Sequence, residues 1–339
     1  MAKNKIKIVI ATPALPPEIG GSSFYAEMLS GAFLAEGRDV SVVAYGFLKK
    51  LPTGLRHIFY AAKLLPSVLT ADFVVALDTF SAAVPTVFVS RLFGKKIIVR
   101  VGGDFLWEEY AERTRQPILL SEFYSGKRNF SPKEKCIFNL TKFSLQKSSA
   151  VVFSTDWQKN IFAEAYGLDS AKIFVVENIY PQNEKRTVAP KNRIILSPSR
   201  DIFLKNKIIL KKSCDSLKEK FPEIVLDTRI SGRAELLSRL IGSYCLIVPS
   251  LSEVSPNIVL DAVSLGVPVA VTEDCGLRNR LQNLVVWIDP RKSESVAEGL
   301  AELMDEKIYD EYLFRLSKFS FVRSPKIVAE EFISIFEKI

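Results

Sequence analysis

Histidine is almost absent from this chain of 339 residues, because His57 is the only one. A metal site built on several histidines is therefore excluded, and a Ser-His, Cys-His or paired-histidine mechanism could rest only on His57. His57 falls in a helical pattern before the third expected strand, and we interpret it as a surface residue rather than a catalytic one. No cluster of other metal ligands is evident, so we expect neither a metal site nor a cofactor.

The sequence is also poor in cysteine and has no long apolar run. Its four cysteines are separated by long stretches without any C-x-x-C spacing, which is typical of buried thiols in a reducing compartment. No uninterrupted apolar run reaches about 18 residues, the length that a membrane-spanning helix needs. No secretory signal with a cleavage site is evident at the start of the sequence. We therefore expect a cytoplasmic protein.

Positive charge is in excess, with 46 Lys and Arg against 38 Asp and Glu, a formal net charge of +8. The densest basic part, residues 113–147, alternates with phenylalanine and tyrosine. Such a segment can contact an anionic membrane surface or nucleic acid. The alternative is a solvated helical face with its aromatic rings in the core. Helix-turn-helix, zinc-finger and RNP patterns are missing, so we expect no nucleic-acid partner.

Short apolar runs alternate with helical patterns along the whole chain, which predicts an α/β fold with parallel sheets covered on both faces. A polar stretch at 181–191, which contains Pro181 and Pro190, interrupts this alternation. We therefore predict a Rossmann-like domain at 1–180, a linker at 181–191 and a second Rossmann-like domain at 192–339, with a cleft between them. We expect the amphipathic segment 314–339 to pack back across the junction. The predicted strands are residues 5–11, 39–44, 73–77, 96–101, 150–154, 172–177, 193–197, 225–230, 245–248, 268–272 and 284–288.

Gly20 and Gly21 follow the first predicted strand, in the stretch Pro16 to Ser23. Two glycines let the backbone approach a ligand closely, and Ser22 or Ser23 could cap the next helix, whose amides then favour an anion. A plain turn between strand and helix is the alternative. The stretch is not a dinucleotide fingerprint, because G-x-G-x-x-G is missing.

Arg200 and Lys205 lie just after the first predicted strand of the second half, on a loop that enters a helix. Two cations five residues apart can hold both sides of a diphosphate, Arg as a planar fork and Lys as a point charge. Cations are unfavourable near the positive end of a helix, so their presence there favours an anionic ligand over a plain surface pair.

The segment from Pro249 to Val269 predicts strand, loop, helix, turn and strand. Ser255 suits the N-cap and Pro256 the first helical position, so the helix begins near Asn257. Glu253 then stays in the loop, while Asp261 lies about one turn into the helix, with the amides of Asn257 and Ile258 between them. Two carboxylates beside an anion-binding helix end would hold hydroxyl groups that flank a phosphate. The alternative is a capping carboxylate and an exposed aspartate.

With these motifs in this order, the whole chain resembles a retaining glycosyltransferase of family four (glycosyl transferases group 1), with the GT-B fold of two facing Rossmann-like domains. The resemblance rests on the Gly20-Gly21 loop, the Arg200-x4-Lys205 pair, the element Glu253-x7-Asp261 and the strand LGVPVAVT after it.

The resemblance implies a role for each matching position. Arg200 and Lys205 would neutralise the leaving diphosphate, and the amides of Asn257, Ile258 and Val259 would bind its oxygens. Glu253 would contact hydroxyls of the donor sugar. The ribose contact would fall to Asp261, and Gly20 and Gly21 would lie against the donor.

The sequence departs from the family pattern at three places. Asp261 stands where the family has a longer Glu, and Cys275-Gly276 replaces a frequent Gly-Gly. The histidine that the family often places near the sugar is missing from the loop 99–108. There, Asp104 either replaces it as a hydroxyl acceptor, or caps a helix after Gly102-Gly103 has made room.

The expected activity is transfer of a sugar from a nucleotide-sugar donor to an acceptor hydroxyl, with retention and without a metal ion. The expected acceptor is a glycan or a lipid-linked carrier in cell-surface glycan assembly, with residues 113–147 on the inner face of the cell membrane. One alternative is a non-catalytic nucleotide-sugar-binding partner of a membrane complex. A sugar-nucleotide epimerase of the same fold is another, although it would normally need several histidines.

Overall fold

The fold is described here from a computed structural model, which covers residues 5–18 and 20–339. These residues form two compact units, each built around a parallel sheet. The first unit contains the described residues up to Trp107, Arg128–Asn178 and Ser324–Ile339. The second unit contains Glu108–Lys127 and Ile179–Arg323.

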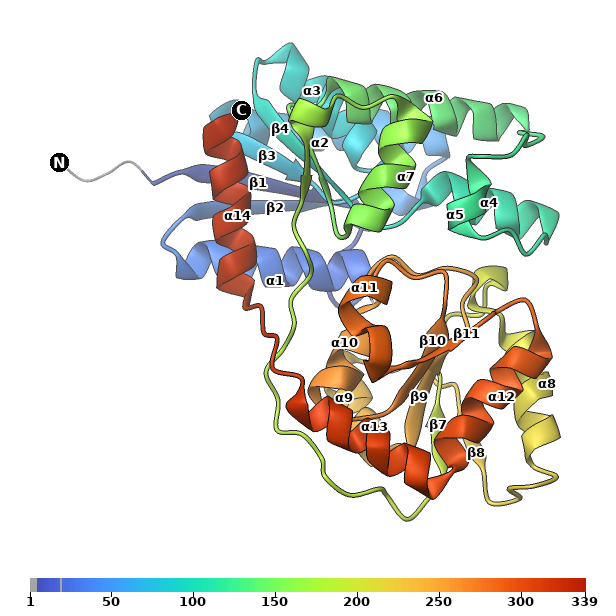
Figure 1. The fold of residues 1–339 in the computed structure, drawn as a ribbon. Helices are drawn as coiled ribbons and strands as arrows, with labels where there is room; N and C mark the ends of the chain where they lie inside the picture. The colour runs from blue at the N-terminus through green and yellow to red at the C-terminus, as the bar shows by residue number, and fades with distance from the viewer. Residues whose placement is uncertain (1–4, 19) are drawn as a thin grey trace. The chain divides into compact units, whose positions relative to one another are not determined.

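The first unit carries, within its described residues, a six-stranded sheet in the order β2-β1-β3-β4-β5-β6 (Figure 1). All its neighbouring strands pair in parallel. The strands are β1 (Lys7–Thr12), β2 (Asp39–Ala44), β3 (Phe73–Ala76), β4 (Lys96–Val101), β5 (Ala150–Phe153) and β6 (Ile173–Val175). The helices of this unit are α1 (Gly21–Ala35), η1 (Gly46–Lys50), α2 (Thr53–Thr70), α3 (Ala83–Leu92), α6 (Pro132–Lys147), α7 (Asp156–Tyr166), η2 (Ser170–Lys172) and α14 (Pro325–Lys338).

The second unit carries a five-stranded parallel sheet in the order β11-β10-β9-β7-β8, again counted over the part of the chain that the structure describes. The strands are β7 (Ile194–Leu196), β8 (Val225–Asp227), β9 (Cys245–Val248), β10 (Val269–Thr272) and β11 (Val286–Ile288). The helices are α5 (Leu120–Phe123), η3 (Phe203–Lys205), α8 (Lys207–Leu217), α9 (Arg233–Gly242), α10 (Asn257–Ser264), α11 (Arg278–Leu281), η4 (Gln282–Leu284), α12 (Ser293–Met304) and α13 (Glu306–Lys318). Helix α4 (Phe105–Thr114) begins in the first unit and ends in the second.

The inner strands of both sheets are apolar on both faces because helices cover both sides. In the second unit, Ile195 and Ile247 pack in a core cluster with residues of α8, α12 and α13. Leu196 and Leu246, their neighbours along β7 and β9, pack in the other cluster with residues of α9 and α10. Burial on both faces is what produces a continuous rather than an alternating apolar run. Each predicted strand range overlaps one observed strand, so these predictions are confirmed.

In each sheet the strand order reverses direction once. The chain passes from β1 outward to β2 and then to β3 on the other side, and it repeats this from β7 to β8 and β9. Ligands of open α/β sheets bind outside the carboxyl ends of the strands at such a reversal. The loops that follow β7 and β9 are therefore neighbours at the reversal of the second sheet.

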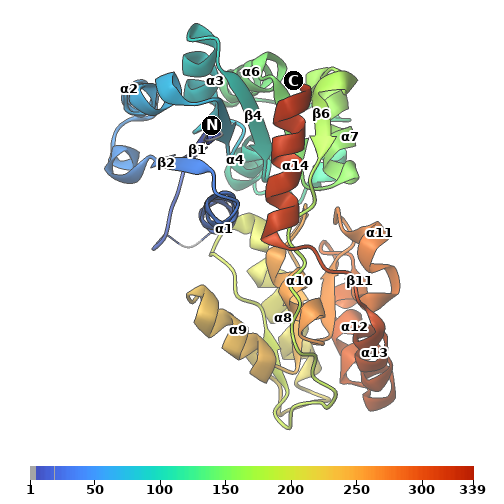
Figure 2. The ribbon, with the colours of Figure 1, turned by 90° about the vertical axis from the view of Figure 1, so that its left-hand side faces the viewer.

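The predicted boundary at residue 180 is wrong for one segment. Residues 108–127 belong to the second unit, because Leu120 and Phe123 are buried and their segment bonds to loops of that unit. The expected packing of the last helix on the first domain is confirmed, because α14 joins the first unit, while α13, with the start of the segment 314–339, stays in the second. In the first unit Phe336 stacks on Phe73 with ring centroids 4.4 Å apart, and Figure 2 shows α14 in red among the elements of that unit.

The predicted linker 181–191 is not a free connection, because it is bonded to the second unit. The guanidinium of Arg186 donates to the carbonyl oxygens of Ser243, Tyr244 and Gly266, the last two at 2.5 and 3.2 Å, and to the Tyr309 hydroxyl at 2.6 Å. The backbone oxygen of Arg186 also lies so close to Gly266 that a Cβ there would be only 3.0 Å from it. Arg186, one of the polar residues that suggested a linker, therefore donates hydrogen bonds to backbone carbonyls of the second unit.

We expect Arg186→Ala to lower the free energy of unfolding by about 3 kcal/mol, because it leaves several half-buried carbonyls without a donor at about 1–3 kcal/mol each. Urea denaturation followed by circular dichroism measures this. Lys191→Ala is the matched control, since Lys191 is exposed in the same segment. Equal midpoints for the two variants would show that residues 181–191 are not anchored.

Candidate active site

The loops after β7 and β9 are hydrogen-bonded to each other at the carboxyl edge of the second sheet. The Leu251 amide donates to the Leu204 carbonyl at 2.9 Å, and the Asn206 side chain donates to the Pro249 carbonyl at 3.1 Å. Asn206 has φ of 55°, a left-handed conformation that asparagine tolerates better than most residues, and it separates η3 from α8. This geometry fixes Lys205, the last residue of η3.

Lys205 and Glu253 form the centre of the site. The ammonium of Lys205 lies 2.6 Å from Oε1 of Glu253 and 3.3 Å from the Ser250 hydroxyl. The Glu253 backbone is held as well, because its amide donates to the Asp274 carbonyl at 3.0 Å and its carbonyl accepts from the Gly276 amide at 2.9 Å. An ammonium has three donors, and these two contacts use two of them, so a third remains available for an anionic oxygen.

Arg200 does not join this pair. Its side chain is exposed in the loop before η3, and among the described residues it forms no hydrogen bond or ion pair with Lys205, Glu253 or Asp261. The structure therefore brings together one of the two predicted cations with the predicted carboxylate, and it leaves the other on the surface of the same loop.

Helix α10 begins at Asn257, as predicted, but its capping differs. The N-cap is Pro256 rather than Ser255, and no side chain accepts a capping hydrogen bond. The Val259 amide donates to the Pro256 carbonyl at 3.0 Å, so this amide is already used inside the first turn. Of the three amides expected to bind phosphate, those of Asn257 and Ile258 come before this one, at the start of the helix.

Asp261 is buried in α10 and pairs with Arg233, a residue that sequence reasoning missed. The guanidinium donates to both carboxylate oxygens, at 2.8 and 2.9 Å, from the first residue of α9. Burial raises the pKa of Asp261, and the charge of Arg233 opposes that rise. Arg233 lies 28 residues away in sequence on another helix, so no local pattern could have identified it.

The replacement of Gly-Gly by Cys275-Gly276 leaves a chemically inert side chain beside the site. Cys275 is buried against apolar residues of α10 and α11. Burial raises the pKa of its thiol to about 12, so the group stays protonated and is a poor nucleophile.

Residues 108–127 contact both loops of the site, which the sequence did not predict. Oε1 of Glu112 accepts the Phe203 amide at 2.6 Å, at the start of η3. The Leu120 amide donates to the Ser252 hydroxyl at 2.8 Å, and that hydroxyl donates to Asp274 at 2.5 Å. The segment therefore holds the Lys205 loop at one end and the Glu253 loop at the other.

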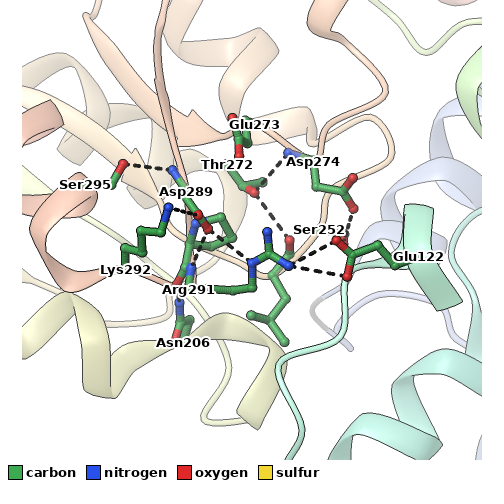
Figure 3. A network of polar contacts seen from close by, with 12 residues as sticks. Glu122, Asn206, Ser252, Thr272, Glu273, Asp274, Asp289, Arg291, Lys292 and Ser295 are labelled. Atoms are coloured by element: carbon green, nitrogen blue, oxygen red, sulfur yellow. Dashed lines mark hydrogen bonds and ion pairs between the residues drawn. The ribbon is translucent and has the colours of Figure 1, made fainter.

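An ion-pair network at the rim of the site adds to these contacts (Figure 3). Arg291 lies between two carboxylates, 3.0 Å from Glu122 of α5 and 3.3 Å from Asp289, and Lys292 also approaches Asp289 at 3.3 Å. Figure 3 shows Ser252 and Asp274 next to Glu122, so the network continues toward the Glu253 loop.

The basic segment 113–147 is not one surface, because the two units divide it after residue 127. Its aromatic rings pack inward: Phe123 is fully buried, and Phe138 stacks on Tyr166 with centroids 5.1 Å apart. On α6 the lysines at 133, 135, 142 and 147 are exposed. The segment therefore agrees with the second of the two interpretations given above, in which its basic residues face solvent and its aromatic rings pack in the core.

In the first unit, Gly20 is the N-cap of α1, and no side chain accepts a capping hydrogen bond, so neither Ser22 nor Ser23 caps the helix. An ideal Cβ at Gly20 or Gly21 would meet no atom within 4 Å, which leaves open space beside this backbone. Ile19, part of the predicted motif, lies outside the described residues.

Asp104 is buried and accepts the Trp107 amide at 3.1 Å, so it caps α4. Gly102 makes room for Arg100, because a Cβ there would lie 2.8 Å from the guanidinium. Arg100, another residue that the sequence did not single out, is buried and donates to Ser154 and Asn178 at 2.8 Å each. Burial lowers the pKa of this guanidinium.

His57 lies on α2 with its ring edge-on to Tyr45 and Phe80, at centroid distances of 6.3 and 5.3 Å. It is half-buried rather than fully on the surface. The ring thus packs among aromatic side chains of the first unit.

Residues 228–318 match the family model of the glycosyl transferases group 1. No curated protein matches the sequence. Among solved structures, sucrose-phosphate synthase from Thermosynechococcus elongatus is similar at 11% identity, with a TM-score of 0.71 and 99% of each chain covered.

Two further solved structures share the fold. WaaG, a glycosyltransferase involved in lipopolysaccharide biosynthesis, is 14% identical, with a TM-score of 0.68 and coverage of 98% of this chain and 99% of that one. A proposed UDP-N-acetylglucosamine 2-epimerase from Listeria monocytogenes is 15% identical, with a TM-score of 0.59 and coverage of 98% and 96%.

At these identities the solved structures establish the fold, and the family match covers α9 to α13, which include Glu253, Asp261 and the strand after them. The predicted GT-B fold is thus confirmed by two parallel Rossmann-like sheets and by neighbours that match over the full length. The chain therefore has the GT-B fold, and its residues 228–318 match the glycosyl transferases group 1.

Proposed function

We propose that this protein is a glycosyltransferase that moves a sugar from a nucleotide-sugar donor to the hydroxyl of a glycan or lipid-linked acceptor, with retention and without a metal ion. The observation that carries the proposal is the Lys205–Glu253 pair, 2.6 Å apart, at the strand-order reversal of the second sheet. A cation and a carboxylate held together there suit a ligand that has both a diphosphate and sugar hydroxyls.

In the proposed reaction the bond between the anomeric carbon and the diphosphate oxygen breaks. The acceptor oxygen forms its new bond on the same face of the sugar, and its proton passes to the leaving phosphate oxygen. Lys205 neutralises the charge that develops on that oxygen, and Arg200 is the second cation of the same loop. Catalysis is then mainly positioning and charge stabilisation by groups already in place.

The remaining predicted residues position the donor in this proposal. The first amides of α10, at Asn257 and Ile258, meet the phosphate oxygens, with Val259 completing that turn. Glu253 accepts a hydrogen bond from a hydroxyl of the sugar. Asp261 accepts one from a hydroxyl of the ribose, and the guanidinium of Arg233 holds the Asp261 carboxylate in place. In the first unit, Gly20 and Gly21 leave room for the donor, and Asp104 is the candidate hydroxyl acceptor.

We place the reaction in cell-surface glycan assembly at the cytoplasmic face of the membrane. The likeness in fold to WaaG supports this assignment. None of the helices formed by residues 5–18 and 20–339 is long and apolar enough to cross a bilayer.

A panel of nucleotide-sugar donors tests the proposal, with thermal shift as the measure of binding and released nucleoside diphosphate as the measure of transfer. Interconversion of two nucleotide sugars without any acceptor would favour an epimerase instead.

Lys205→Met should lower the turnover number by about 10- to 100-fold, because one charge-assisted contact is worth about 1.5–3 kcal/mol and about 1.4 kcal/mol is a factor of ten. Release of nucleoside diphosphate at saturating donor measures it. Lys211→Met is the control, since Lys211 is exposed on the following helix and should leave turnover unchanged. Near-normal turnover of the Lys205 variant would remove its role at the leaving group.

Glu112 is a positioning residue in this scheme, because it holds the Phe203 amide at the start of the turn that carries Lys205. We expect Glu112→Ala to reduce the turnover number by about tenfold, the cost of a displaced charge-assisted contact. Glu112→Gln, which keeps an acceptor oxygen, should recover most of it. A fall in thermal stability with an unchanged turnover number in Glu112→Ala would mean that the contact serves the fold alone.

A further inference from the structure

Helix α2 of the first unit is apolar on two opposite faces. Its inner face carries Tyr60, Leu64 and Val68, which are fully buried in the unit. Its outer face carries Leu55, Ile58, Phe59 and Leu69, with side chains 50%, 66%, 52% and 45% exposed. A helix that is apolar all round is normally covered on every side.

The exposed apolar surface extends beyond α2. Phe47 of η1, the short helix just before it, is 75% exposed. The neighbouring helix α3 exposes Phe88 and Leu92, which are one turn apart, at 60% and 67%. Large exposed side chains of the second unit, such as Ile241 and Phe314, are instead spread singly over different elements, which is usual for a soluble surface.

The charged side chains of η1 and α2 are all cations. Between Asp39 and Asp72 the sequence has no Asp or Glu, and it has four cations: Lys49, Lys50, Arg56 and Lys63. Lys49 pairs with Glu18, while Lys50 is exposed and the Lys63 ammonium donates to the Ala44 carbonyl at 2.6 Å. An apolar stripe with basic residues along it matches an anionic lipid surface.

We propose that the outer face of α2, together with Phe47, is a surface by which the first unit docks on an anionic membrane. The apolar side chains enter the boundary between headgroups and acyl chains, and the lysines reach the headgroups. Contact of this face with a second copy of the chain is disfavoured, because a two-fold pair would bring the same cations together. The proposal concerns the surface alone, so its test needs neither donor nor acceptor.

The experiment is cosedimentation of the full chain with vesicles of phosphatidylethanolamine and phosphatidylglycerol at low salt, with phosphatidylcholine vesicles for comparison. We expect binding to the anionic vesicles, weakened at high salt. Ile58→Ser with Phe59→Ser should weaken it by about tenfold or more, because two apolar side chains leave the bilayer boundary. Ile241→Ser with Phe314→Ser, a matched loss of two exposed apolar side chains in the second unit, should bind like the native chain.

Equal vesicle binding by the Ile58/Phe59 variant and the native chain would overturn the assignment to α2. An absence of binding to anionic vesicles at low salt would overturn membrane docking as a whole. Light scattering measures the oligomeric state of the native chain and of the Ile58/Phe59 variant. If the native chain is a dimer, the variant is a monomer and neither binds vesicles, the face is a contact between two copies of the chain. Circular dichroism of each variant controls for folding.

Discussion

The adjacency of β7 and β9 is the constraint on which the site depends. Because parallel strands end at the same edge, the loops that follow these two neighbours are brought together although they lie 48 residues apart at Lys205 and Glu253. The order of the strands in the sheet thus holds a cation and a carboxylate at ion-pair distance. In the proposed reaction, charge that is already in place needs little reorganisation.

The exchange of chain segments between the two units has a direct bearing on this site. Residues 108–127 follow the first sheet in sequence but bond to the second unit, through Glu112, Leu120 and Glu122. Helix α14 makes the opposite exchange and packs on the first unit. The loops of the proposed donor site are therefore supported by a segment that sequence order assigns to the acceptor side.

The first unit combines a closely packed interior with large apolar side chains on its exterior. Arg100, Gly102 and Asp104 form a tightly fitted loop in which a missing Cβ makes room for a buried guanidinium and a carboxylate caps a helix. In contrast, α2 leaves Ile58 and Phe59 in contact with solvent, as η1 and α3 do with Phe47 and Phe88. Packing inside the unit does not explain those side chains, since the inner face of α2 already fills the core. An external apolar partner with negative charge does.

The sequence by itself determined the strands, the start of α10 and the order of the motifs, because these depend on local periodicity, turn chemistry and short spacing. Every predicted strand is present, and the positions of Lys205 and Glu253 after strands follow from the same reasoning. Only the tertiary structure decided which distant residues meet. Arg233 pairs with Asp261, and Glu112 accepts the Phe203 amide. Arg186, in the predicted linker, donates to backbone carbonyls of the second unit such as that of Tyr244. The tertiary structure also turned the aromatics of 113–147 inward. Contacts between distant segments depend on how helices pack over the sheets, and no local pattern encodes that.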